Sequence, residues 1–385
     1  MKTFAASALL AALLAVQATG CSTQTADPTP TPTATPEATE SDTATTVDLS
    51  DSGVTVDGAA VDSDTESPVL VDQSLYDAAG ESTATAVVIT QPGTYRLSGT
   101  LTDGQVAVDL GTDAASDPEA VVTLILDGVD ITCSSAPALV VENVYECADL
   151  TAEITSPEVD TTTAGISLVL ADGSENTLTS TSADAVATLS TAMSLNVSGQ
   201  EEGDGLLTVT SASAGIQGAA HLTLDSGRMV VQSQSTGLQA NEEALSVITV
   251  NGGKLFVNAG QDGASSAVAS QGHVVVNDGE LVALSADEGL SASSGVQING
   301  GSVLAMGSAV TPVDEGSAQA VLDWIFTEPQ SAGALLTIQD GDGEELLSYT
   351  LERDCTAFLF SSPQLTDAST CTVTVGNVSE ENGDA

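Results

Sequence analysis

Basic side chains are almost absent from this sequence. Its 385 residues include five Lys plus Arg against 54 Asp plus Glu, which gives a formal net charge of −49. Binding to nucleic acid needs basic groups that displace counterions from the phosphates, so nucleic acid is excluded as a partner. An anionic polymer would bind only where a cation bridged it. The same charge keeps an exported protein soluble.

Aromatic residues and long apolar runs are also scarce. Phe, Trp and Tyr make up 3% of the chain, whereas hydrophobic residues make up 42%. This balance suits a narrow core filled by aliphatic side chains. No segment shows a long apolar stripe with the 3.6-residue period of a helix. After the amino-terminal leader, no segment is long and apolar enough to span a bilayer. The sequence therefore predicts an all-β protein.

The first 20 residues have the features of a secretory signal peptide. Lys2 supplies the positive start, and the apolar stretch 8–16 is too short to span a bilayer. Small residues then precede Cys21, as in a bacterial lipoprotein cleavage site at which Cys21 becomes the lipidated first residue. The alternative is ordinary cleavage nearby with Cys21 unmodified. We expect lipidation, which anchors the exported chain to the outer face of a bacterial membrane only through its lipid.

Residues 21–45 are rich in Thr and Pro and hold almost no large apolar side chain. Such a segment cannot bury a core and predicts a disordered linker.

Four cysteines follow this linker. An even number in an exported chain suggests disulfides. Nearest-neighbour pairing is one of three connectivities and the one we favour; the alternative is isolated buried thiols. The favoured pairs are Cys133 with Cys147 and Cys355 with Cys371.

A ladder of glycine-terminated units fixes the fold class. Its units are 22, 26, 26 and 22 residues long and start at Gly205, Gly227, Gly253 and Gly279, with Gly301 closing the last. A fixed period in this range indicates a solenoid, and an all-strand unit of this length indicates one coil of a parallel β-helix. We place this domain at residues 46–310. Residues 311–385 predict a small β-rich domain with a polar tail, which shields the open end of the solenoid.

Side chains alternate between the two faces of a strand, so the repeat can be sorted into columns. In each unit, two positions after the starting glycine and two before the next one point inward. The inward positions after the glycines are Leu207 and Val209, Met229 and Val231, Leu255 and Val257, Leu281 and Ala283, and Val303 and Ala305. A polar residue follows the second strand of each unit, where we expect stacked side chains to hydrogen-bond along the turn. These residues are Asp225, Asn251, Asn277 and Asn299.

Three outward side chains are candidates for carbohydrate binding. Arg228 and Lys254 each follow a starting glycine, so they stack on one face and could meet a sugar carboxylate. The alternative is a surface ion pair between Lys254 and Glu280. Phe256 lies in an outward column that begins with Thr208 and continues with the apolar residues Val230, Val282 and Leu304. Such a stripe marks something that covers it: either packing by the carboxy-terminal domain or a sugar platform centred on Phe256.

Two histidines share a further outward column. His221 and His273 lie two coils apart, which is too far for one zinc ion, and we expect both to face solvent.

Several motifs together resemble a family of bacterial surface proteins described as carbohydrate-binding domain proteins. These motifs are GTYRLSGTLTDGQ at 93–105, LILDGVDIT at 124–132, GSENTL at 173–178, the later Asn-Gly-Gly turns, and FSSPQL at 360–365. The resemblance covers the chain from about Val47 to Val375. It implies a right-handed parallel β-helix that binds calcium and plant-type polysaccharide, particularly acidic pectic chains such as pectin, without bond cleavage.

The resemblance also implies where calcium would bind. The family's bend reads Asp-Asp-Gly followed by an aliphatic residue. In this sequence the acids of that column are Asp184, Asp262, Asp287 and Glu288, while the middle coils lack acids there. Acids on neighbouring coils can share a calcium ion, because strands stack about 4.8 Å apart and calcium takes several oxygen ligands. Asp184 would belong to a separate site. The alternative is that all four are solvated acids.

These observations predict a monomeric, non-catalytic polysaccharide-binding lipoprotein on the bacterial cell surface. Two alternatives stay open. A calcium-dependent pectate lyase-like enzyme would use Arg228 as its base, although the scarcity of Lys and Arg argues against it. An adhesin or structural surface protein would bind a protein partner instead.

Overall fold

A computed structural model of the chain describes residues 44–61, 67–72, 74–75, 84–152, 156–261 and 263–377. These residues contain no α-helix; two short 3-10 helices, η2 (Ala114–Ser116) and η3 (Ala368–Thr370), accompany the strands. No helix in this described part is long and apolar enough to cross a membrane. The prediction of an all-β protein is confirmed. The predicted signal peptide, Cys21 and nearly all of the predicted linker lie outside the described residues.

The strands form three sheets. The largest has 19 strands and contains β1 (Thr45–Leu49), β2 (Thr55–Val56), β3 (Ala59–Ala60), β6 (Gly93–Leu101), β8 (Val122–Cys133), β10 (Ile166–Leu170), β11 (Glu175–Ser180), β13 (Leu195–Gly199), β14 (Leu206–Ser211), β16 (His221–Leu224), β17 (Arg228–Ser233), β19 (Val247–Val250), β20 (Lys254–Asn258), β22 (His273–Val276), β23 (Glu280–Leu284), β25 (Gly295–Ile298), β26 (Ser302–Gly307), β27 (Val321–Gln330) and β30 (Cys355–Ser361). The second has nine strands: β4 (Val69–Asp72), β5 (Thr85–Ile89), β7 (Gly104–Asp109), β9 (Leu139–Asn143), β12 (Ala187–Thr191), β15 (Ala214–Gly218), β18 (Leu238–Ala240), β21 (Val268–Ser270) and β24 (Leu290–Ala292). The third has three strands: β28 (Ala334–Gln339), β29 (Glu345–Thr350) and β31 (Thr372–Asn377).

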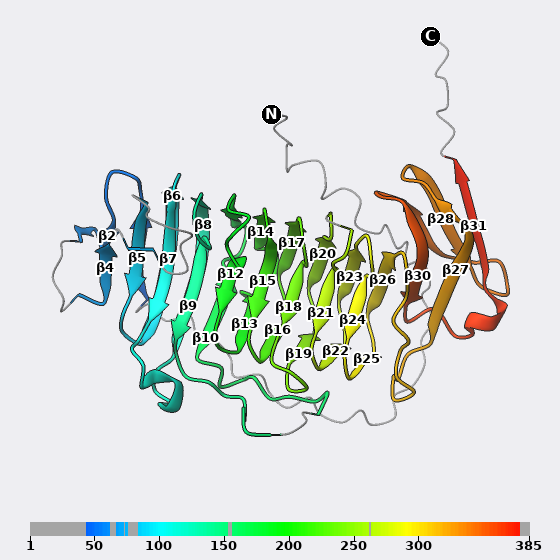
Figure 1. Cartoon of the computed structure of the whole chain (residues 1–385), viewed down its shortest axis with the longest axis horizontal. Coiled ribbons are helices and arrows are strands. Elements are labelled where there is room, and N and C mark those ends of the chain that lie inside the picture. Colours follow the sequence, from blue (N-terminus) through cyan, green and yellow to red (C-terminus); the bar gives the residue numbers. More distant parts are fainter. Residues whose placement is uncertain are drawn as a thin grey trace, which may run out of the picture.

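The large sheet divides into two rows of parallel strands at β8. This strand is 12 residues long; its first half pairs with β10 and its second half with β11. The first row continues through β13, β16, β19, β22 and β25, and the second row through β14, β17, β20, β23 and β26. The second sheet supplies a third row, β12, β15, β18, β21 and β24. The rows run side by side along the long axis of the molecule (Figure 1).

The predicted inward columns form the core between these rows. Met229, Leu255, Leu281 and Val303 are successive register partners in the second row, and all four are buried. The same cluster of aliphatic side chains extends from Val47 to Leu359. Full burial of one such side chain contributes about 1.5–3 kcal/mol, so stability is spread along the whole stack.

The turns between the first and second rows carry the predicted polar ladder. The Nδ2 of Asn251 donates to Oδ1 of Asp225 at 2.8 Å, that of Asn277 to Asn251 at 2.9 Å, and that of Asn299 to Asn277 at 2.9 Å. The following glycines allow the turn to close. Gly253 has φ +75°, and a Cβ there would lie 2.5 Å from the carbonyl oxygen of Gly227. Only glycine fits this turn without strain.

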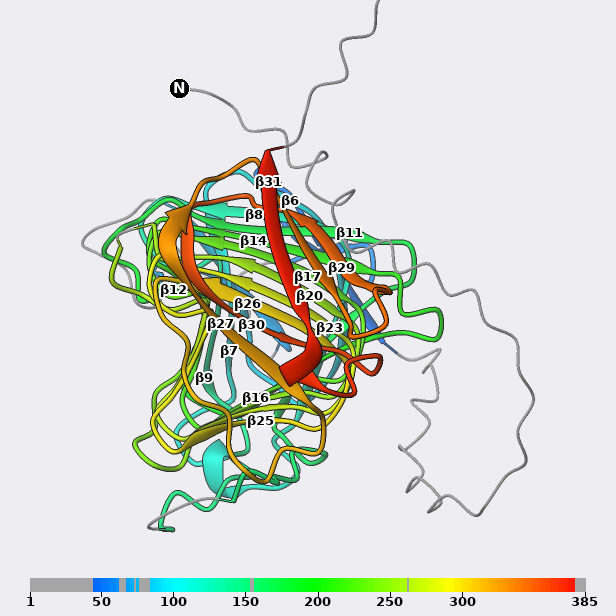
Figure 2. The same cartoon turned by 90° about the vertical axis from the view of Figure 1, so that its right-hand side faces the viewer.

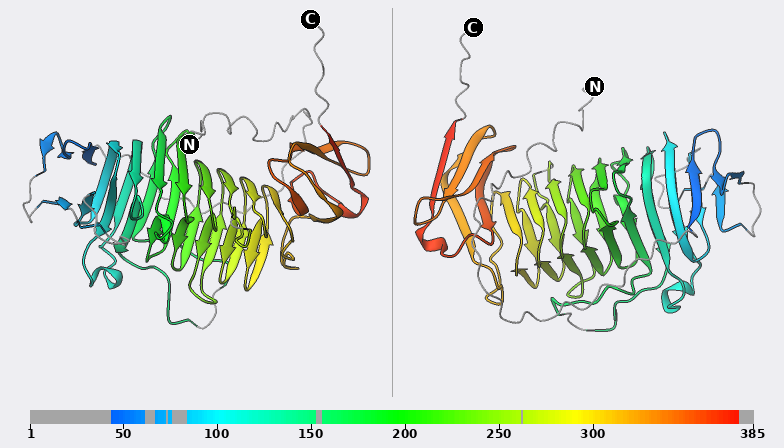
Figure 3. Two further views of the ribbon diagram at one scale, coloured as in Figure 1. Left: turned by 45° about the horizontal axis from the view of Figure 1, so that its top comes forward. Right: turned by 180° about the vertical axis from the view of Figure 1, so that it is seen from behind.

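The parallel pattern ends at β26, and antiparallel strands follow. β30 pairs antiparallel with both β26 and β27. The three-stranded sheet lies at this end of the molecule, as the red and orange strands in Figures 2 and 3 show. Its residues Leu336, Ile338 and Leu347 share a second hydrophobic cluster with Val230, Phe256, Val282 and Leu304 of the second row. The carboxy-terminal strands therefore cover the apolar outward stripe.

We predict that Phe256→Ala lowers the free energy of unfolding by about 3–5 kcal/mol, the usual cost of removing a buried aromatic side chain. Chemical denaturation followed by circular dichroism would measure the change. Val186→Ala is the control, because the side chain of Val186 is 45% exposed. An unchanged denaturation midpoint for the Phe256 variant would contradict the packing described here.

Candidate functional site

The outward face of the second row presents three columns of side chains. Their order follows from the register of β8, β11, β14, β17, β20, β23 and β26. The first column contains Glu175, Leu206, Arg228, Lys254, Glu280 and Ser302. The second contains Asp130, Thr177, Thr208, Val230, Phe256, Val282 and Leu304. The third contains Thr132, Thr179, Thr210, Gln232, Asn258, Leu284 and Met306.

The carboxy-terminal strands cover one half of this face. Phe256 is only 4% exposed and lies within the second hydrophobic cluster. Arg353, from the loop before β30, donates from Nη1 to the carbonyl oxygen of Ala259 and to Oδ1 of Asn258. Burial lowers the pKa of Arg353 below its usual value. The interpretation of Phe256 as a sugar platform is therefore corrected: its ring packs against the carboxy-terminal strands, and no ring face is open to a ligand.

Arg228 and Lys254 are register neighbours, as predicted, but their surroundings differ. The Nζ of Lys254 lies 2.9 Å from Oε2 of Glu280, so Lys254 forms the surface ion pair that was the alternative interpretation. Such an exposed pair contributes at most about 1 kcal/mol. The guanidinium of Arg228 is half-buried and makes no hydrogen bond or ion pair with any residue that the structure describes. Of the two cations, Arg228 is the one free to meet a ligand.

The open half of the face carries four threonines, of which the sequence analysis placed only Thr208 in an outward column. Thr177 and Thr179 on β11 lie beside Thr208 and Thr210 on β14. Thr210 is exposed and the other three are partly exposed. The signal for the others was a Thr-x-Thr spacing on successive strands; β14 belongs to the first regular unit, but the less regular spacing before Gly205 concealed the register of β11.

In the part of the chain that the structure describes, the predicted calcium ligands lie on two bends, with Asp184 apart from the others as expected. Asp184 lies in the bend between β11 and β12, whereas Asp287 and Glu288 lie between β23 and β24. In the bend after β23, Ser285 Oγ accepts from the backbone N–H of Asp287 and donates to the carbonyl of Glu288. Asp262 lies outside the described residues. Among the residues the structure does describe, no group of three or more His, Cys, Asp or Glu side chains could hold a metal ion.

The four cysteines are free thiols, so the predicted disulfides are not formed. Cys133 is enclosed in the main core at the end of β8, whereas Cys147 lies in the segment after β9, next to Glu146. Cys355 is buried at the start of β30, and Cys371 lies beside the carbonyl of Asp367. Burial raises the pKa of Cys355 to about 11. The structure corresponds to the alternative of isolated thiols.

The segment between β9 and β10 contacts the outward face of the first row at β13 and β16. Glu146 accepts hydrogen bonds from the backbone N–H and the hydroxyl of Ser194, both at 2.7 Å. Further along, the carbonyl of Thr161 accepts from Nδ2 of Asn196 at 2.6 Å. His221 is therefore buried, not solvent-facing as expected, and burial lowers its pKa.

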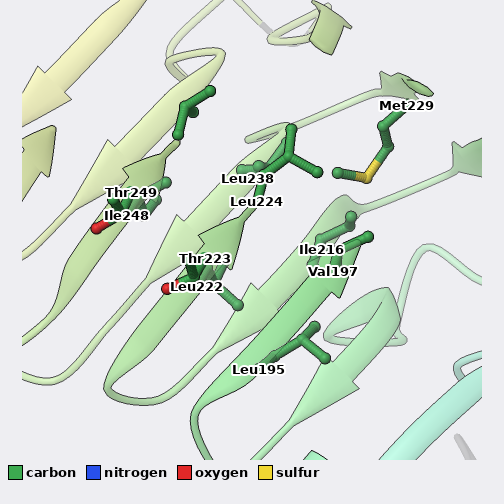
Figure 4. A pocket seen from close by; sticks show the side chains of 11 residues that line it. Leu195, Val197, Ile216, Leu222, Thr223, Leu224, Met229, Leu238, Ile248 and Thr249 are labelled. Carbon is green, nitrogen blue, oxygen red and sulfur yellow. The ribbon is translucent and has the colours of Figure 1, made fainter. Parts of the chain in front are cut away.

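The cavity in Figure 4 lies within the stack and is apolar. Its volume is about 20 Å³, and Leu195, Ile216, Leu222 and Met229 are among its lining residues. This volume holds about one water molecule, not a sugar ring. It is a packing defect between coils and does not serve as a ligand site.

We predict that the chain from residue 22 onward, purified without reductant and then unfolded in guanidinium, reacts with four equivalents of a thiol reagent. In the native state the buried thiols should react slowly, because burial raises their pKa and blocks access. Reaction of no thiol in the unfolded protein would restore the disulfide prediction.

Comparisons with known proteins agree with the family that the motifs resemble. A family model described as "Carbohydrate-binding domain-containing protein" matches residues 83–342. No curated protein matches the chain. One similar solved structure is described as a polysaccharide lyase-like protein from C. thermocellum (gadolinium derivative), with 21% sequence identity, a TM-score of 0.41, and coverage of 71% of this chain and 98% of that one. At that TM-score the likeness supports no argument about this chain. Because the family match spans well over half of its length, the chain belongs to the carbohydrate-binding domain-containing family.

Proposed function

We propose that this protein binds polysaccharide at the bacterial cell surface without cleaving it. The observation that carries the proposal is the open half of the second row's outward face. There, polar side chains recur on successive strands in register, so the surface repeats at the strand spacing of about 4.8 Å. A repeating surface suits a repeating polymer, because each coil can offer the same contacts to successive sugars.

The family match supports association with carbohydrate, and the chemistry of the face supports binding over catalysis. A lyase needs a positioned base together with a cation that stabilises the uronate. Arg228 is the one candidate base on this face, since Lys254 is paired with Glu280. Of the acids proposed as calcium ligands, Asp287 and Glu288 share one bend, Asp184 lies on another, and Asp262 lies outside the described residues, so calcium binding stays a prediction. Among the described residues of this face, the lyase-like alternative has Arg228 as its one candidate base.

Four finer features belong to the same proposal. We infer a right-handed coil, because parallel crossover connections are right-handed in about 98% of cases. Lipidation at Cys21 would hold the protein at the membrane, with residues 22–45 as its tether. Acidic glycans such as pectin would need calcium bridges, given the net charge of −49. The stack suits a monomer, since its carboxy-terminal end is closed by strands of its own chain.

The test is binding of the mature chain, carrying Cys21→Ser to avoid lipidation, to immobilised polysaccharides with calcium and with EDTA. We expect saturable binding to at least one polymer and no unsaturated uronate among the products. Absence of binding across the panel would contradict the proposal. Sustained release of unsaturated uronate would establish the lyase instead.

A further inference from the structure

The exposed threonines of this protein fall into two groups by the hydrogen bonding of their hydroxyls. The hydroxyls of Thr102, Thr151 and Thr162 each donate to a nearby Asp, at 2.7, 2.6 and 2.6 Å. Those of Thr177, Thr179, Thr208 and Thr210 form no hydrogen bond with any described residue, and neither does the guanidinium of Arg228 beside them. Five polar groups on one surface thus have no hydrogen-bond partner within the described ranges of the chain.

We propose that this surface, the threonine face formed by Thr177, Thr179, Thr208, Thr210 and Arg228, is the docking site for an uncharged, hydroxyl-rich polysaccharide chain. The proposal rests on the proposed function and assigns it a site and a class of ligand.

The orientation of the face is fixed by the core beneath it. Leu178 and Val209 are fully buried and are themselves register partners, so the residues on either side of each must point outward. Strands lie about 4.8 Å apart and each residue rises about 3.3 Å, so the four hydroxyls form a grid of roughly 4.8 by 6.6 Å. Each threonine hydroxyl can donate one hydrogen bond and accept two. Every sugar residue of a polysaccharide likewise carries hydroxyl groups that donate and accept hydrogen bonds.

The face has a defined end on the side of the carboxy-terminal strands. The register partner of Thr208 on the next strand is Val230, which is 6% exposed and lies in the second hydrophobic cluster. Leu206 packs against the same cluster. Arg228 is the register partner of Leu206 and lies on the same strand as Val230, so it lies where the open half of the face meets the covered half. Its planar group offers five N–H donors, which suit sugar hydroxyl and ring oxygens.

The charges around the face select an uncharged ligand. Asp130 and Glu175 are register partners of Thr177 and Leu206, and both carboxylates are exposed. The charged groups around this face are thus one guanidinium and two carboxylates, in a chain with a formal net charge of −49. A polyanion would be repelled, whereas neutral hydroxyls have no such cost.

The test compares three variants of the mature chain. Thr177→Val/Thr208→Val removes two hydroxyls and keeps the β-branched shape that strands favour. Arg228→Gln removes the charge and most of the donors. Thr374→Val is the matched control, because Thr374 is an exposed strand threonine on β31, in the three-stranded sheet. Thermal unfolding would verify that each variant folds like the wild type.

Binding would be measured in EDTA to hydroxyethylcellulose, glucomannan, xylan and polygalacturonate. We expect the wild type to bind an uncharged polymer most tightly. The double variant and Arg228→Gln should each weaken that binding about tenfold, as expected for loss of one or two hydrogen bonds, while Thr374→Val leaves it unchanged.

The outcomes separate the two proposals. If the wild type binds an uncharged polymer and the double variant binds it equally well, the threonine face is not the site, although the proposed function stands. Tighter binding of polygalacturonate than of any uncharged polymer in EDTA would overturn the ligand class. If no polymer binds in EDTA or in calcium, the proposed function itself fails.

Discussion

The parallel register between successive strands is the constraint on which the rest of this structure depends. Backbone pairing aligns position with position from one coil to the next, so a residue type that recurs in the sequence becomes a continuous column in space. Inside, the columns are aliphatic and form one core along the molecule. At the turns, the same alignment joins Asp225 to Asn299 through a chain of side-chain hydrogen bonds. A slip of one residue would turn every inward side chain outward.

The same alignment explains how one face serves two purposes. Along the second outward column, the residue type changes from threonine to valine between β14 and β17. The apolar half is buried beneath the carboxy-terminal strands, which also close the end of the stack. The polar half stays open, with Arg228 where the two halves meet. The carboxy-terminal strands therefore stabilise the stack, and their edge marks where the polar, open half of the face ends.

The sequence was sufficient to predict features that follow from periodicity. The inward columns, the polar ladder and the neighbouring placement of Arg228, Lys254 and Glu280 all depend on a repeat that is visible in the letters. Features that depend on what packs over a column were not predictable in the same way. The apolar stripe around Phe256 left packing and sugar binding open, and only the position of Leu336 and its neighbours decided between them. His221 is buried because Glu146, 75 positions earlier in the chain, anchors a segment across its face. Cysteine spacing likewise says nothing of whether two thiols lie on the same side of the core.

The most direct test of the register is disulfide trapping in the chain from residue 22 onward, with its four cysteines replaced by Ala. Lys254 and Glu280 are register partners on adjacent strands, and Ser302 is the partner of Glu280 on the next. A disulfide forms only where the Cα atoms lie within about 7 Å, so adjacent strands are in reach and the second strand, at about 9.6 Å, is not. Mild oxidation should crosslink Lys254→Cys/Glu280→Cys and leave Lys254→Cys/Ser302→Cys reduced. Crosslinking of the second pair but not the first would contradict the stacking on which this account rests.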